Sequence, residues 1–181
     1  IFRQPGGRFH SWRIRATHGP FPFPRALGLS RRPGLAARQA AARLLAAIVD
    51  RHVSADGLMD EAGGNPAYLA LEPRDRALVR AMVNSALRHR LALQALIDRL
   101  LDRPLPANAH ALQHILHIAM AQMFFLDVPA HSAVDLAVEQ AGGDPRTRRF
   151  ANLVNAVLRA AQRLPEAERN AILKEAPQLP A

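Results

Sequence analysis

The sequence contains no cysteine, one tryptophan and one tyrosine. Without cysteine, disulfide bonds, thiolate metal sites and cysteine nucleophiles are excluded from this chain. The same absence fits a reducing, cytoplasmic compartment. No apolar run reaches the roughly 20 residues that span a bilayer, so no membrane partner is expected. The chain also lacks a GxGxxG or Walker loop and a serine-centred elbow, and we therefore expect no catalytic residue in it.

Acidic residues are missing from the first 34 positions, which hold seven arginines and are rich in proline and glycine. The formal net charge of +9 therefore lies mostly in this segment, because the remaining residues have 17 bases against 15 acids. We interpret residues 1–34 as a disordered basic tail. High overall charge is consequently no evidence that the folded part binds nucleic acid.

From Leu35 onward, apolar residues recur with helical spacing and no strand pattern is seen. Helix boundaries are marked by Pro73 and Pro129 at starts and by Gly142 and Gly143 at a stop, and Asp144-Pro145 is expected to open the next helix. Around residues 88–90 the helical spacing of apolar residues is interrupted, which predicts either one kinked helix or two abutting helices. We expect a compact all-α bundle of about seven helices in total, with the folded domain over residues 35–164 and a short last helix with a linker over residues 165–181.

Arginines cluster at three places in this pattern, on the first helix, on the helix that follows Pro73 and just after Pro145. Those in the first helix are expected on its polar side, and those after Pro73 follow i, i+4 spacing on one outer face. Such rows suit contact with phosphates, but charge rows are more often solvated faces paired with nearby acids. The candidate RNA-binding residues are Arg38, Arg43, Arg76, Arg80, Arg146, Arg148 and Arg149.

Three histidines, His110, His114 and His117, share one helical face. Their spacing permits a metal site, but no cysteine exists and no acid shares that face, so no metal ligand is predicted. Two acidic groups come without a nucleophile and are interpreted as helix caps. These groups are Asp56, Asp60 and Glu61, and Asp127, Asp135 and Glu139.

Three stretches in order, EPRDRALVRAMVNSALRHR, DVPAHSAVDLAVEQA and LVNAVLR, resemble the NusB-type RNA-binding domain. They look most like the copy at the N-terminus of Sun/RsmB-type rRNA methyltransferases, which form 5-methylcytosine. The resemblance implies a NusB-like helical fold and RNA contact by the first-helix arginines. It also implies structural roles for three residues. Asp75 would cap its helix, with Arg76 pairing across the bundle, Pro129 would start a helix, and Asn155 would make a buried hydrogen bond between helices.

Three functions remain open on this basis. The favoured function is that of an RNA-binding domain that positions rRNA, as part of an rRNA (cytosine) methyltransferase. The alternatives are a free-standing NusB-type transcription antitermination factor and a helical protein-interaction module without RNA affinity. In the first case S-adenosylmethionine and the cysteine nucleophiles would belong to a further domain, and this chain would need no cofactor. The implied partners are rRNA, the chain's own C-terminal methyltransferase domain and a ribosomal protein.

Overall fold

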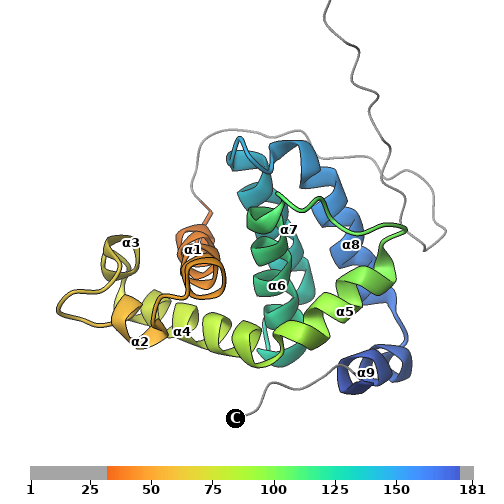
Figure 1. The fold of residues 1–181 in the computed structure, drawn as a ribbon, viewed down its shortest axis with the longest axis horizontal. Helices are drawn as coiled ribbons and strands as arrows, with labels where there is room; N and C mark the ends of the chain where they lie inside the picture. Colours follow the sequence, from red (N-terminus) through yellow and green to blue (C-terminus); the bar gives the residue numbers. More distant parts are fainter. Residues whose placement is uncertain (1–31, 176–181) are drawn as a thin grey trace, which may run out of the picture.

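The computed structural model describes residues 32–175, and within them every regular element is helical (Figure 1). The predicted tail up to residue 31 and the predicted linker from residue 176 lie outside the described residues. The elements are α1 (Leu35–Arg51), α2 (Ala55–Leu58), α3 (Pro66–Leu69), α4 (Pro73–Arg88), α5 (Arg90–Leu100), α6 (His110–Phe125), α7 (Ala130–Gly143), a 3₁₀ turn η1 (Arg148–Phe150), α8 (Ala151–Arg163) and α9 (Glu166–Glu175).

Helix α6 forms the centre of the bundle and is buried on nearly all sides. It packs against α1, α4, α5, α7 and α8. Figure 1 shows α6 and α7 side by side, with α1 to one side, α8 to the other, and α4 and α5 meeting at an angle beneath them. A helix that is apolar all round can lie only in such a core. The all-α bundle predicted from the sequence is therefore confirmed.

Several helix ends follow the sequence signals. Pro129 immediately precedes α7, and its carbonyl accepts hydrogen bonds from the Ser132 and Ala133 amides at 2.9 and 3.1 Å. Helix α7 ends at Gly143, as predicted. The interruption near residues 88–90 is a break between two abutting helices, because His89 closes α4 and opens α5.

One expectation about a helix start needs correction. Asp144-Pro145 opens a turn instead of a helix, since the Asp144 carbonyl accepts from the Thr147 and Arg148 amides and α8 begins only at Ala151. The expected number of about seven helices is close to the nine α-helical segments of the described residues, two of which, α2 and α3, are one-turn helices. The one-turn helix α3 lacks the repeated apolar spacing that reveals a helix in a sequence.

The start of α1 is fixed by a turn at residues 32–34. Gly34 has a left-handed backbone with φ of 81°, and the Leu35 amide donates to the Arg32 carbonyl at 3.1 Å. Arg32 also forms an ion pair with Glu139 of α7 at 3.2 Å. The last three residues of the predicted tail thus belong to the ordered bundle.

At the other end, α9 packs against α5 (Figure 1). Arg99 pairs with Glu168 at 3.7 Å, and the Arg169 guanidinium lies over the Phe124 ring, 5.0 Å from its centroid. No helix among residues 32–175 is both long and apolar enough to cross a membrane.

Candidate nucleic-acid interface

The turn between α7 and α8 holds three of the predicted RNA-binding arginines on a fixed backbone. The Thr147 hydroxyl is buried and donates to the Ala141 carbonyl at 2.8 Å. Arg148 Nε donates to the Gly142 carbonyl at 3.0 Å, and the Arg149 guanidinium lies 4.6 Å from the Phe150 centroid. All three arginines, including Arg146, are exposed. A turn anchored in this way holds its cations at the surface without burying them.

Helix α1 contributes Arg43 to the same region. The pKa of Asp144 is lowered chiefly by its hydrogen bonds from Arg146, at 2.7 Å for Nη2, and the positive charge of Arg43 adds to this lowering. Arg43 is exposed. Residues a hundred positions apart in the sequence are therefore brought within electrostatic range of each other. We call Arg43, Arg146, Arg148 and Arg149 the arginine cluster.

Arg38 does not lie on the polar side of α1, contrary to the prediction. Its side chain is buried, with 7% of the residue exposed. Nε donates to Gln122 Oε1 of α6 at 2.9 Å, and Nη1 donates to the Gly34 carbonyl at 3.2 Å. Burial lowers the pKa of Arg38, and the nearby Asp75 carboxylate opposes that shift. A phosphate contact through Arg38 would have to replace these bonds.

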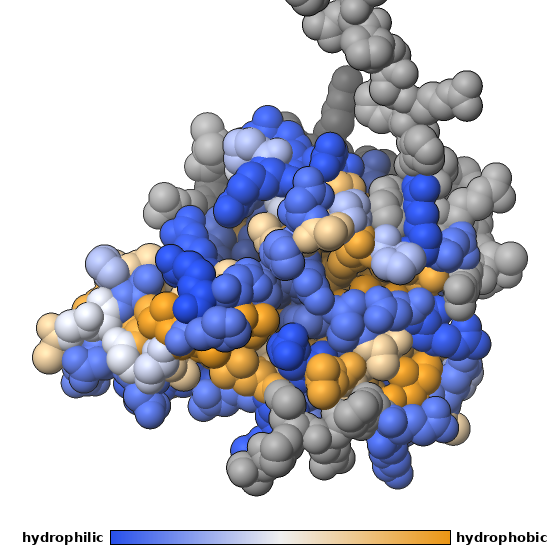
Figure 2. Space-filling view, in the orientation of Figure 1, coloured by the Kyte–Doolittle hydropathy of each residue, from blue (hydrophilic) through white to orange (hydrophobic). Residues whose placement is uncertain are grey.

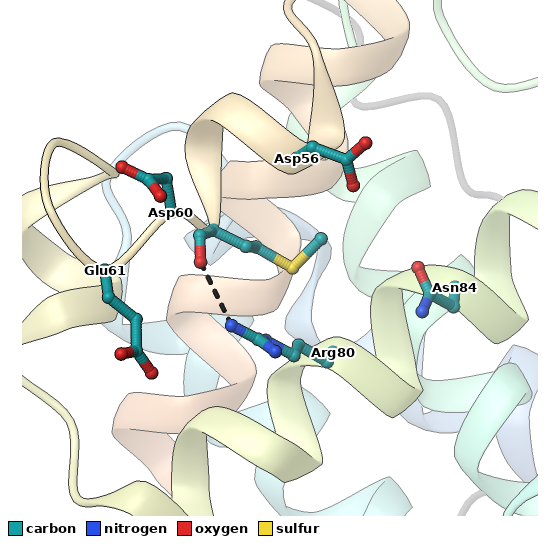
Figure 3. A pocket seen from close by; sticks show the side chains of 6 residues that line it. Asp56, Asp60, Glu61, Arg80 and Asn84 are labelled. Atoms are coloured by element: carbon teal, nitrogen blue, oxygen red, sulfur yellow. Dashed lines mark hydrogen bonds between the residues drawn. The ribbon is translucent and has the colours of Figure 1, made fainter.

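Arg80 extends from α4 and holds the α2–α3 segment in place. Nε donates to the Tyr68 hydroxyl at 2.6 Å and Nη2 donates to the Met59 carbonyl at 3.1 Å. It lines an open hollow of about 370 Å³ (Figure 3). The other lining residues are Asp56, Met59, Asp60, Glu61 and Asn84. Three carboxylates around one guanidinium repel phosphate, so this surface is poorly suited to RNA.

Asp75, Arg76 and Asn155 were predicted to make contacts that stabilise the fold. Asp75 lies in the first turn of α4, where Glu72 is the cap residue and no side chain makes a capping hydrogen bond. Arg76 is half-buried, and no ion pair links it to another described residue. Asn155 is half-buried at the edge of the apolar stripe of α8, and its side chain makes no hydrogen bond with residues 32–175, so the predicted buried bond is absent.

Two histidines of α6, His114 and His117, are buried, and each contacts a polar side chain of another helix. His114 Nε2 lies 2.9 Å from Asp50 Oδ2 of α1, and His117 Nε2 lies 3.2 Å from Gln94 Oε1 of α5. No group of three histidine or acidic side chains that could hold a metal ion occurs within the described residues. The sequence indicated the shared face but not these partners, which come from helices distant in the chain.

A model of the NusB family matches residues 35–163. The chain is 42% identical over 132 residues to ribosomal RNA small subunit methyltransferase B of Xanthomonas campestris, covering 72% of this chain and 29% of that protein. The proteins of the same name from Vibrio vulnificus and Pseudomonas putida are 36% and 34% identical over 128 residues each, covering 70% of this chain and 28% of those proteins. The chain thus spans less than a third of the length of these relatives.

Proposed function

The chain belongs to the NusB family, and we propose from this premise that it is an RNA-binding domain that positions ribosomal RNA for a methyltransferase. The observation that supports this most strongly is the arginine cluster. It consists of three exposed arginines on the α7–α8 turn and the exposed Arg43 of α1, whose charge acts on Asp144 of the same turn. Arginine binds phosphate with two parallel hydrogen bonds, and several such contacts give salt-dependent affinity for RNA. Arg43, Arg148 and Arg149 would contact phosphates directly.

Within the arginine cluster, Arg146 has a second role. Its ion pair with Asp144 is short and well aligned, with Nη2 and Oδ2 at 2.7 Å and Nε within 3.2 Å of both carboxylate oxygens. The pair cancels one positive charge in the middle of the surface. Asp144 would therefore limit unspecific attraction of anions, leaving the other three arginines to set the register of the RNA backbone.

The methyltransferase itself would lie in a part of the protein other than this chain. The relatives named above are methyltransferases of which this chain matches 28–29%. Under this proposal S-adenosylmethionine would bind in that other part, and this chain would need no cofactor of its own. Under this proposal the chain would bind and orient RNA in the cytoplasm, and the methyltransferase domain C-terminal to it would act on that RNA.

Two other functions are less well supported. An antitermination factor would act with a ribosomal protein, but the relatives named above are methyltransferases. A protein-interaction module would leave the arginine cluster merely solvated. A protein-interaction module would not bind RNA, whereas the proposed RNA-binding domain would, so RNA binding distinguishes the two.

We expect RNA binding by the full chain to weaken with salt and to depend on the arginine cluster. In the double variant Arg43→Ala/Arg148→Ala, two phosphate contacts are lost, so the slope of log affinity against log salt should become shallower by about 1.4 on single-stranded RNA. Equilibrium binding measured by fluorescence anisotropy over a range of salt concentrations tests this.

The matched control is Arg74→Ala/Arg163→Ala, which removes the same charge at two exposed arginines on other helices. This control should lower affinity only slightly and leave the slope within about half a contact of the original. Equal losses in the two double variants would mean that net charge alone drives binding, and the proposal would be wrong.

A further inference from the structure

Two rings stack on each other at the corner where α4 meets α5. The His89 imidazole and the Phe125 ring at the end of α6 have centroids 3.8 Å apart and planes inclined by 13°. Both residues are half-buried, so the stack is neither closed off in the core nor fully solvated. His89 is held there because it terminates one helix and starts the next, with its carbonyl accepting from the Leu93 amide at 2.8 Å.

One arginine acts on this stack, and a second lies over the neighbouring ring of α6. Arg88 is exposed, and its charge together with partial burial lowers the pKa of His89, with burial the larger cause. The guanidinium of Arg169, in α9, lies 5.0 Å from the ring centroid of Phe124, the residue before Phe125 in α6. Figure 2 shows orange apolar side chains alternating with blue hydrophilic ones along the lower edge of the molecule, where Figure 1 places α4, α5 and α9. The exposed acids near these residues in the sequence are Asp127, which follows α6, and Glu166 and Glu168 of α9, of which Glu168 pairs with Arg99.

We propose that the partly exposed His89–Phe125 stack receives an unpaired base of single-stranded RNA, while Arg88 and Arg169 hold the flanking phosphates. The inference rests on the proposed RNA-binding function and adds a second contact region to it, on helices other than those of the arginine cluster. The ligand class is therefore single-stranded or looped RNA with an accessible base.

The chemistry of the corner fits a base better than another occupant. Aromatic faces bind bases of any sequence because every base has a π-face, and neighbouring arginines follow the backbone. A paired base inside a duplex cannot reach such a stack, since both of its faces are covered. A purely apolar partner would leave Arg88 and Arg169 without a counter-charge, whereas the RNA backbone supplies one.

Equilibrium binding of the full chain to an RNA of about 12 nucleotides, as a single strand and as a duplex of the same sequence, tests the inference. Phe125→Leu keeps an apolar side chain against the core but removes the ring, and His89→Asn removes the imidazole. Each should lower single-strand affinity about tenfold and leave duplex affinity within about twofold. Thermal unfolding of each variant confirms that the fold is kept.

Arg88→Ala and Arg74→Ala form the matched charge pair, since both arginines are exposed on α4 and only Arg88 adjoins the stack. The first should weaken single-strand binding more than the second. Unchanged single-strand affinity in both ring variants, or equal losses for single strand and duplex, would overturn the inference while leaving RNA binding intact. Failure of the unaltered chain to bind either RNA would instead overturn the proposed function.

Discussion

Acidification from pH 6.5 to about 4 should cost this protein roughly 3 kcal/mol of unfolding free energy through one residue, His117. Burial, together with the positive charges of His114 and Arg90, lowers the pKa of His117 from 6.5 to about 3. The ring is 1% exposed, and its Nδ1 has no hydrogen-bond partner within the described residues. A second proton on that ring would therefore be a buried charge without an acceptor.

The direction follows from where the proton binds. Below pH 6.5 the unfolded chain takes up a proton at His117, whereas in the folded bundle His117 stays neutral down to about pH 3. The stabilising effect is therefore complete above pH 6.5 and is lost as the pH falls through this window. Because natural domains are stable by only about 5–15 kcal/mol, the loss is a large fraction of the total.

Urea unfolding at pH values from 7.5 down to 4 measures the effect. His117→Gln keeps a donor near Gln94 but removes the titration, so its stability should fall much less across the window. His110→Gln, at an exposed site on the same helix, is the control and should keep the original pH dependence. If His117→Gln and the unaltered protein show parallel curves, His117 is not the residue responsible.

Substitution of Arg38 by alanine should destabilise the bundle by roughly 2–3 kcal/mol. The change removes the bond to Gln122 Oε1 and leaves that oxygen buried without its donor, since Gln122 is 1% exposed. It also deprives the Asp75 carboxylate of a nearby positive charge. Chemical denaturation at pH 7 should therefore show a clearly lower midpoint.

Arg43→Ala is the matched control, because Arg43 is an exposed arginine five residues further along the same helix. Its effect on stability should stay within about 0.5 kcal/mol. The two arginines thus separate stability from binding, with Arg38 expected to act on the first and Arg43 on the second. Equal stability of the Arg38→Ala variant and the unaltered chain would show that the buried bond contributes nothing.

The position of Arg38 shows how far the sequence could be interpreted. Arg38 shares a helical face with Ala41, Ala42 and Leu45, all buried, so helical spacing itself indicated burial. The prediction went wrong because arginine was assigned to the polar side by its charge. Its partner Gln122 could not be identified, since hydrogen bonds between residues 84 positions apart depend on how α1 crosses α6.

Helices with repeated apolar spacing were predictable because their apolar faces must be buried, as the central position of α6 shows. Contacts fixed by tertiary packing were not. The stack of His89 on Phe125 and the bond from Arg80 to Tyr68 join residues whose spacing in the chain carries no periodic signal. The same holds for the arginine cluster. Its arginines could be identified in the sequence, but that Arg43 lies in the same region as those after Pro145 depends on the fold.

The most direct measurement for the central claim is RNA affinity of a chain that begins at Arg32, compared with the full chain over a range of salt concentrations. The shortened chain keeps the Arg32–Glu139 pair and the turn at Gly34, so we expect the helical bundle to fold without residues 1–31. We expect it to bind RNA with an affinity that falls as salt rises, and to weaken further when Arg43 and Arg148 are replaced. Binding seen only when residues 1–31 are present would contradict the account, because the tail would then be the RNA-binding element and the bundle would not.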